Sequence, residues 1–151
     1  MIRFECDYAE GAAPQLLERL TRTNLEQTPG YAVDGHCQRA RDLIRAACAA
    51  PQAEVEFLVG GTQANQTVIS AALRPYQGAL CAQTGHINVH ETGAIEATGH
   101  KVLPLPSQDG KITPKQVEQF CAVHWADPTR EHIVQPGIVY LSQPTETGLL
   151  Y

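Results

Sequence analysis

Residues 57–66 read FLVGGTQANQ, an apolar run that meets two glycines and then a polar segment typical of a helix start. Residues 54–59 predict a strand, and residues 63–73 predict a helix that ends before Pro75. A strand that turns directly into a helix is the repeating unit of α/β proteins. The stretch therefore predicts an α/β fold, and it raises the question of why the turn holds Gly-Gly-Thr.

Spacing alone leaves two interpretations of this turn open. A helix N-terminus has unpaired backbone N–H groups and the positive end of the helix dipole, which attract phosphate. Gly60 and Gly61 let the backbone approach an anion closely because neither has a Cβ, and Thr62 and Gln63 add a hydroxyl and a backbone amide. The segment lacks both the lysine of a Walker loop and the spacing of GxGxxG. The alternative is a plain strand-to-helix turn with Thr62 as the N-cap.

Outward from this turn, predicted strands alternate with predicted helices. Strands are expected at residues 79–83, 101–105 and 138–142, and helices from Pro14, over 37–48, within 86–100 closed by Gly99, and from a cap at Thr113-Pro114 with an apolar stripe of Val117, Phe120, Cys121 and His124. This alternation predicts a mostly parallel sheet with helices on both faces.

The composition is that of a soluble globular protein: 151 residues, 43% hydrophobic and 18% charged, with a formal charge of -5. An acidic balance argues against a general nucleic-acid binder, although a small anionic ligand needs only a local cluster of donors. The five cysteines are scattered without a CxxC pair, so neither a zinc ribbon nor a redox dithiol is indicated. No apolar run approaches the ~20 residues of a membrane span, and no signal-peptide pattern opens the chain, so we expect a cytoplasmic protein.

Two further segments carry groups that could do chemistry. The segment GHINVHETGAIE (85–96) contains His86, His90 and Glu91. The two histidines could share a helical face, but HxxxHE is not HExxH and no third ligand follows, so no metal site is predicted. A histidine that stacks on a flat cofactor ring is another interpretation, and for His90 and Glu91 a solvated helix surface is expected. Glu146 follows the last predicted strand, where open α/β sheets hold ligands, and its plain interpretation is a solvated turn carboxylate.

Together, the segments FECDYAEG, GYAVDG, FLVGGTQANQ, GHINVHETGAIEATGHKV, GKIT and VYLSQPTETGLLY resemble the N-terminal part of the threonine aldolase/β-eliminating lyase family. The motifs occur in order over essentially all 151 residues. The resemblance implies an aspartate aminotransferase-like fold and pyridoxal 5′-phosphate (PLP) as the cofactor. It also implies cleavage of the Cα–Cβ bond of a threonine-like 3-hydroxy amino acid to glycine and an aldehyde.

The resemblance implies roles for the residues that would hold the cofactor and act on the substrate hydroxyl. The family's phosphate-binding turn matches Gly61 and Thr62, with Gly60 and Gln63 beside them. His86 matches the histidine that stacks on the pyridine ring. Glu146 stands where relatives carry a histidine that acts on the substrate hydroxyl, and a carboxylate could serve there as the base.

Three residues of the first part of the chain are implied to contact the substrate. Asp7 lies in the arm near the substrate end of the site. Cys6 stands where relatives often carry Ser or Asn to hold the substrate carboxylate. Tyr31 matches a tyrosine that reaches into the site of a neighbouring subunit, so a homodimer or homotetramer with shared active sites is expected, without nucleic-acid or membrane partners.

The family's Schiff-base lysine has no match in this chain. Its three lysines, Lys101, Lys111 and Lys115, stand elsewhere. We therefore expect the truncated N-terminal portion of the enzyme, inactive by itself, with residues 1–35 as arm, helix and active-site loop and residues 36–151 as the first part of an incomplete PLP-binding large domain. The alternatives are a non-catalytic fragment that associates with itself or with its missing half, and an unrelated phosphate-binding α/β domain.

Overall fold

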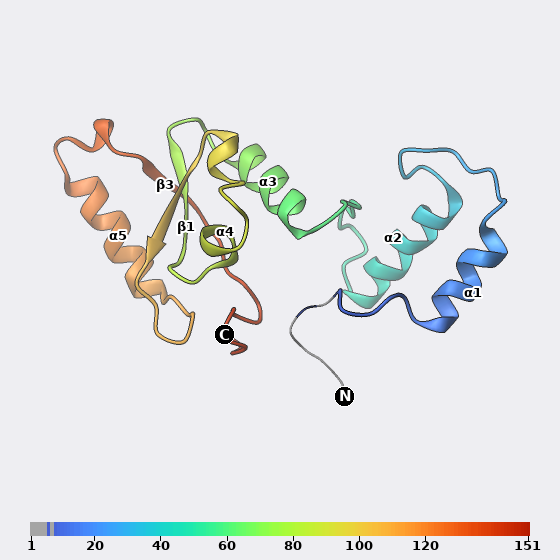
Figure 1. The fold of residues 1–151 in the computed structure, drawn as a ribbon. Helices are drawn as coiled ribbons and strands as arrows, with labels where there is room; N and C mark the ends of the chain where they lie inside the picture. Colours follow the sequence, from blue (N-terminus) through green and yellow to red (C-terminus); the bar gives the residue numbers. More distant parts are fainter. Residues whose placement is uncertain (1–5, 7) are drawn as a thin grey trace. The chain divides into compact units, whose positions relative to one another are not determined.

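A computed structural model describes residue 6 and residues 8–151 (Figure 1). Packing divides the chain into two compact units, Met1–Phe57 and Leu58–Tyr151. The expected division after residue 35 concerns function and stays a prediction.

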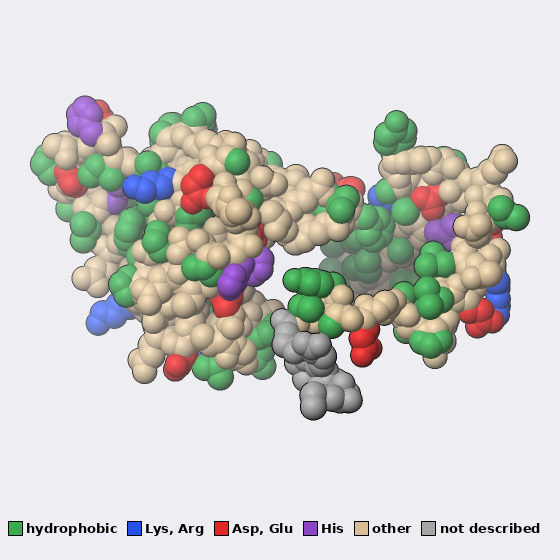
Figure 2. Space-filling model, viewed as in Figure 1, with side chains coloured by type: hydrophobic (Ala, Val, Ile, Leu, Met, Phe, Trp, Pro, Cys, Tyr) green, Lys and Arg blue, Asp and Glu red, His purple; other side chains and the backbone are tan. Residues whose placement is uncertain are grey.

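Within its described residues, the first unit contains two helices, α1 (Pro14–Thr23) and α2 (Gly35–Ala47). Both were predicted, and Pro14 stands at the start of α1, where a missing N–H costs nothing. Large apolar side chains of both helices are nevertheless exposed: Leu16, Leu17, Leu20, Leu43 and Ile44. Hydrophobic side chains are visible on the surface of the protein (Figure 2). The unit therefore keeps apolar faces that its own helices do not cover.

Asp34 caps the N-terminus of α2, and acid is expected to release this cap. Its carboxylate accepts hydrogen bonds from the amides of His36 and Cys37, each at 2.9 Å. Hydrogen bonds from the side chain and amide of Cys37 lower the pKa of Asp34 from 3.8 to about 2. Since the folded pKa is the lower one, the cap stabilises α2 above pH 3.8, and that stabilisation is lost as the pH falls to about 2.

An NMR titration of the Asp34 carboxyl checks the folded pKa directly. Asp34→Asn keeps an oxygen acceptor without the charge, and it should abolish this acid transition while leaving α2 helical at neutral pH. A carboxyl that titrates near 3.8, the ordinary pKa of an aspartate, would contradict the capping argument.

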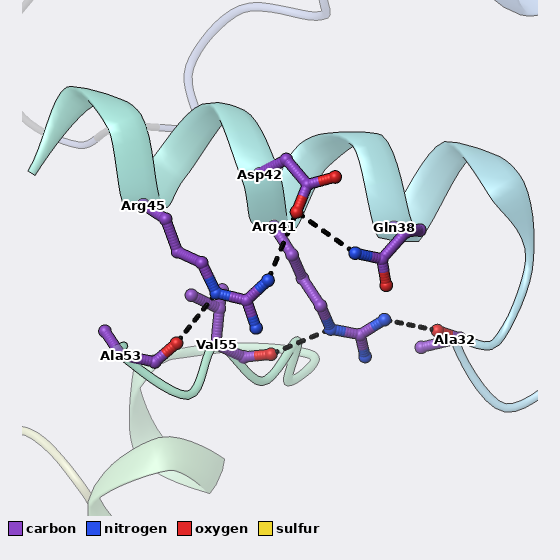
Figure 3. A network of polar contacts seen from close by, with 7 residues as sticks. All are labelled: Ala32, Gln38, Arg41, Asp42, Arg45, Ala53 and Val55. Carbon is purple, nitrogen blue, oxygen red and sulfur yellow. Dashed lines mark hydrogen bonds and ion pairs between the residues drawn. The ribbon is translucent and has the colours of Figure 1, made fainter. Parts of the chain in front are cut away.

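Two arginines of α2 hold the segment that follows the helix (Figure 3). Arg41 Nε donates to the carbonyl oxygen of Val55 at 3.0 Å, and Arg45 Nε donates to that of Ala53 at 2.8 Å. These side chains satisfy carbonyl groups that a strand would offer to a neighbouring strand. The strand predicted at residues 54–59 is accordingly wrong, since the chain forms no ladder there.

The second unit is built on three parallel strands, β1 (Gln77–Ala82), β2 (Lys101–Leu105) and β3 (Gln135–Val139), in the order β2-β1-β3. The prediction for β2 is confirmed, and β1 begins two residues earlier than expected. The third strand was predicted at 138–142, but it begins and ends three residues earlier. Its last bond to β1 is from the Tyr140 amide to the Leu80 carbonyl, 2.8 Å, after which the chain leaves the sheet.

Helices cover both faces of this sheet (Figure 1). Successive residues of β1 point to opposite faces, as the pleat requires. One core cluster joins the helices α3 (Gly61–Ala72) and α4 (His86–Val89) to the sheet through Ile69, Leu73, Ala79, Cys81, Ile87, Ile95 and Val102. The other joins α5 (Pro114–Ala126) to the opposite face through Leu80, Ala82, Leu103, Leu105 and Ile112. The predicted α/β architecture is confirmed.

The cap and stripe predicted for α5 are confirmed as well. The side chains of Thr113 and Gln116 form a reciprocal capping box at its N-terminus. Three stripe residues, Val117, Phe120 and Cys121, pack against the second core cluster, and His124 is buried.

The helix predicted within residues 86–100 is interrupted. It is reduced to α4 and a 3₁₀ turn, η1 (Glu96–Thr98), and a second such turn, η2 (Arg130–His132), precedes β3. Thr92 and Gly93 have φ of 56° and 74°, and left-handed residues end a right-handed helix. Gly99 closes the segment at φ 88°, as predicted.

Candidate functional site

A pocket lies where β1 and β3 end, the edge at which open α/β sheets usually bind ligands. Its volume is about 450 Å³, and it is lined by Asn65, His86, Tyr140, Leu141, Ser142, Gln143, Pro144 and Glu146. The lining residues come from α3, from the start of α4 after β1, and from the loop after β3. The fold thus brings α3, which follows the Gly-Gly-Thr turn, next to His86 and Glu146, two residues that the sequence places in separate segments.

Glu146 is held at this pocket by two hydrogen bonds. Its Oε1 accepts from the backbone amide of His86 at 2.7 Å and from the Ser142 hydroxyl at 2.5 Å. The carboxylate is half-buried and connects residues 60 positions apart. The expectation of a solvated turn carboxylate is therefore wrong, because the α4 N-terminus supplies a donor that a free turn lacks.

The loop that carries Glu146 is fastened to the rest of the second unit. Thr145 is buried, and its hydroxyl accepts from the Leu149 amide at 3.1 Å. Thr147 Oγ1 donates to the carbonyl oxygen of Asp109 at 2.8 Å. Gly110, at φ 73°, allows close approach, since a Cβ there would stand 3.0 Å from Thr145 Cβ. The position of Glu146 is thus set by contacts on both sides of it.

His86 is paired with a buried carboxylate. Its Nδ1 lies 2.8 Å from Glu91 Oε1, and Asn65 Nδ2 donates to the same oxygen at 2.5 Å. The Glu91 side chain is 0% exposed, whereas that of His86 is 46% exposed. The expectation of a solvated Glu91 is wrong, because the left-handed residues after it end the helix and the chain turns back toward the core. His90 is exposed as expected, with its ring 5.4 Å from that of His86.

The Gly-Gly-Thr turn forms the N-terminus of α3. Gly60 is the N-cap, and no side chain of the described residues caps the helix, so the alternative with Thr62 as N-cap is wrong. The side chain of Gln63 accepts from the Val59 amide at 2.7 Å and closes the turn. A Cβ on Gly60 or Gly61 would meet nothing within 4 Å. The first amides of α3 are thus left without a side-chain cap beside two glycines that have open space around them, which suits an anion.

The turn and the pocket belong to one side of α3. Thr62 and Asn65 are three residues apart, a spacing that places both side chains on the same face of a helix. Because Asn65 lines the pocket, Thr62 lies one helical turn away along the same face.

Of the predicted site residues, the structure brings together His86 and Glu146 and places the turn of Gly60 to Gln63 on the helix beside them. Cys6, a half-buried free thiol, and Tyr31, which is exposed at φ 62°, belong to the first unit. Asp7 lies outside the described residues. Sequence reasoning missed Asn65 and Ser142 and misjudged Glu91, although the spacing of Asn65 from Thr62 was available as a signal.

The helices of the described residues include none that is both long and apolar enough to cross a bilayer.

Comparison with known proteins gives matches along nearly the whole chain. Residues 6–149 match the family model described as Beta-eliminating lyase. Two curated relatives, the low specificity L-threonine aldolases of Pseudomonas sp. (strain NCIMB 10558) and Pseudomonas aeruginosa, are each 30% identical over 151 residues, 99% of this chain and 42% of the relative.

A solved structure of Leishmania major threonine aldolase aligns with a TM-score of 0.88 and 45% identity, covering 96% of this chain and 41% of that one. The chain therefore spans less than half the length of these relatives.

Proposed function

This chain belongs to the beta-eliminating lyase family, and on that premise we propose that it forms part of the active site of a PLP-dependent enzyme that cleaves the Cα–Cβ bond of a 3-hydroxy amino acid. The proposed products are glycine and an aldehyde. The relatives that support this proposal are named threonine aldolases. The observation that carries the proposal is the pocket at the ends of β1 and β3, which combines His86, Glu146 and the helix behind an open Gly-Gly-Thr turn.

The described residues fit PLP in two respects. The open amides at Gly60, Gly61 and Thr62 would hold its phosphate, since no side chain of the described residues occupies the N-terminus of α3. The half-exposed ring of His86 would lie against the flat pyridine ring. PLP, when bound, supplies the electron sink that the breaking bond requires.

Glu146 is proposed as the base that takes the proton of the substrate hydroxyl. Its Oε1 is fixed by His86 and Ser142, and the carboxylate lines the pocket. A general base must be held within hydrogen-bond reach of the proton it removes. Two donors on one oxygen orient the carboxylate and leave its second oxygen for the substrate.

Cys6, Asp7 and Tyr31 are proposed to contact the substrate, with Tyr31 acting in the site of a neighbouring copy. The exposed ring of Tyr31 and the uncovered apolar faces of α1 and α2 support an oligomer with shared sites. We propose that the enzyme works in the cytoplasm and that it forms a homodimer or homotetramer. Light scattering of the purified protein gives its molar mass and so tests the oligomeric state.

The assignment of the phosphate site is tested at Gly61 and Thr62. In the complete protein that carries these residues, Gly61→Ala and Thr62→Val are each expected to weaken PLP binding roughly tenfold. The Cβ that Gly61→Ala adds would keep the phosphate away from the first amides of α3, and Thr62→Val removes the hydroxyl that would donate a hydrogen bond to a charged group. Gly61→Ala should leave the fold intact, because its Cβ enters open space at a helix start. Spectrophotometric titration of the apoprotein with PLP measures both affinities.

A matched control lies on the same helix. Thr67→Val, five residues after Thr62 on α3 and exposed, should bind PLP as the wild type does. Unchanged affinity in both test variants would mean that the turn serves only to start the helix.

A further inference from the structure

Glu91 is the one carboxylate among the described residues that is buried. Burying a charged carboxylate costs several kcal/mol unless partners compensate, and an apolar residue of similar shape is often as stable there. Glu91 Oε2 finds no partner in the described chain, so its burial is incompletely compensated. Stability alone therefore does not account for a glutamate at this position.

Both partners of Glu91 belong to the candidate site. Asn65 projects from α3, one turn after Thr62, and His86 begins α4 after β1. Their donors meet on Oε1, at 2.5 Å from Asn65 Nδ2 and 2.8 Å from His86 Nδ1. A single buried oxygen thus ties the helix that carries the open turn to the ring that lines the pocket.

The contact also constrains the protonation of the histidine ring. An ionised carboxylate only accepts hydrogen bonds, so a proton must reside on Nδ1 of His86 whether the ring is neutral or charged. The other groups beside the ring are His90, at 5.4 Å between centroids, and Glu146, which contacts the backbone amide of His86 and not its ring. Neither competes for Nδ1.

We infer that Glu91 is a positioning residue, which holds His86 in the Nδ1–H form at a fixed orientation and links it to α3 through Asn65. The consequence for catalysis rests on the proposed function: the ring and the phosphate turn are kept in register for one flat ligand. The state of the ring itself does not depend on any ligand.

The test is ¹⁵N NMR of histidine-labelled complete protein without PLP, with the His86 signals assigned by their loss in His86→Asn. The wild type should show a pyrrole-like Nδ1. Glu91→Gln keeps an oxygen acceptor of the same shape and should keep this signature, whereas Glu91→Met fills the space without an acceptor and should give signals averaged between two tautomers. PLP affinity should fall roughly tenfold in Glu91→Met and stay near wild type in Glu91→Gln.

The control is Glu96→Gln, which removes an exposed carboxylate five residues after Glu91. It should change neither the ¹⁵N signals of His86 nor the affinity for PLP. A residue that only fills space predicts the same spectra for the Gln and Met variants, and that result would overturn the inference. A wild-type ring protonated at Nε2 alone would overturn it too, even if Glu91→Met failed to fold. If His86 keeps its proton on Nδ1 while Thr62→Val binds PLP as tightly as the wild type, the proposed function would be contradicted. The positioning role of Glu91 would then still stand.

Discussion

Glu146→Gln is expected to lower kcat for carbon–carbon cleavage by roughly 10²- to 10⁴-fold in the complete protein, the usual contribution of a general base. The amide oxygen of glutamine can still accept from the His86 amide and the Ser142 hydroxyl, so the loop should keep its place. The loss then reports the missing proton acceptor and not a displaced loop. Steady-state kinetics with threonine, with glycine and acetaldehyde measured as products, give kcat and KM separately.

The control for Glu146→Gln is Glu96→Gln, which removes an exposed carboxylate of the same unit outside the pocket. KM should change little, because the proposed base acts on the proton in the transition state more than on substrate binding. A Glu146→Gln enzyme that keeps kcat within about threefold of wild type, far less than a general base contributes, would remove Glu146 from the base role.

Leu80→Ala is expected to destabilise the second unit by about 2–5 kcal/mol. Leu80 is 1% exposed on the central strand β1, and it packs with Leu103 and Ile112 beneath α5. The truncation leaves a cavity between the sheet and α5, a helix whose stripe of Val117, Phe120 and Cys121 packs against the same cluster. A loss of this size is a large part of the total stability of an ordinary domain.

Urea unfolding followed by circular dichroism measures the free energy difference for Leu80→Ala. Val123→Ala removes two methyl groups from an exposed position of α5 and should cost no more than about 0.5 kcal/mol. A Leu80 variant as stable as the Val123 variant would show that the second cluster does not hold α5 to the sheet.

The sheet was predictable because its signals are local. Short apolar runs bounded by turns gave all three strands within three residues, and the Thr113-Pro114 cap marked the start of α5. The strand expected at residues 54–59 failed because arginine side chains of α2, distant in sequence, take the carbonyl groups of Ala53 and Val55 where that strand would start. Periodicity carries no information about such competition.

The site was predictable only in part, for a related reason. His86 and Glu146 were identified by resemblance, but their contact spans 60 residues and follows from the parallel pairing of β1 with β3. Glu91 was misjudged because its burial depends on two left-handed residues after it, of which Thr92 carries no glycine signal. Asn65 and Ser142 belong to the site through their hydrogen bonds to Glu91 and Glu146, and a linear motif does not show such contacts.

The arginine contacts of α2 also bear on whether residues 54–59 can pair with a strand of another chain. Residues 54–59 read EVEFLV, a β-prone sequence whose Phe57, Leu58 and Val59 are exposed. Such a segment would template intermolecular strand pairing if its backbone were free. Arg41 already occupies the carbonyl group of Val55, and Arg45 occupies that of Ala53 just before the segment, so the start of this segment offers fewer free acceptors for such pairing.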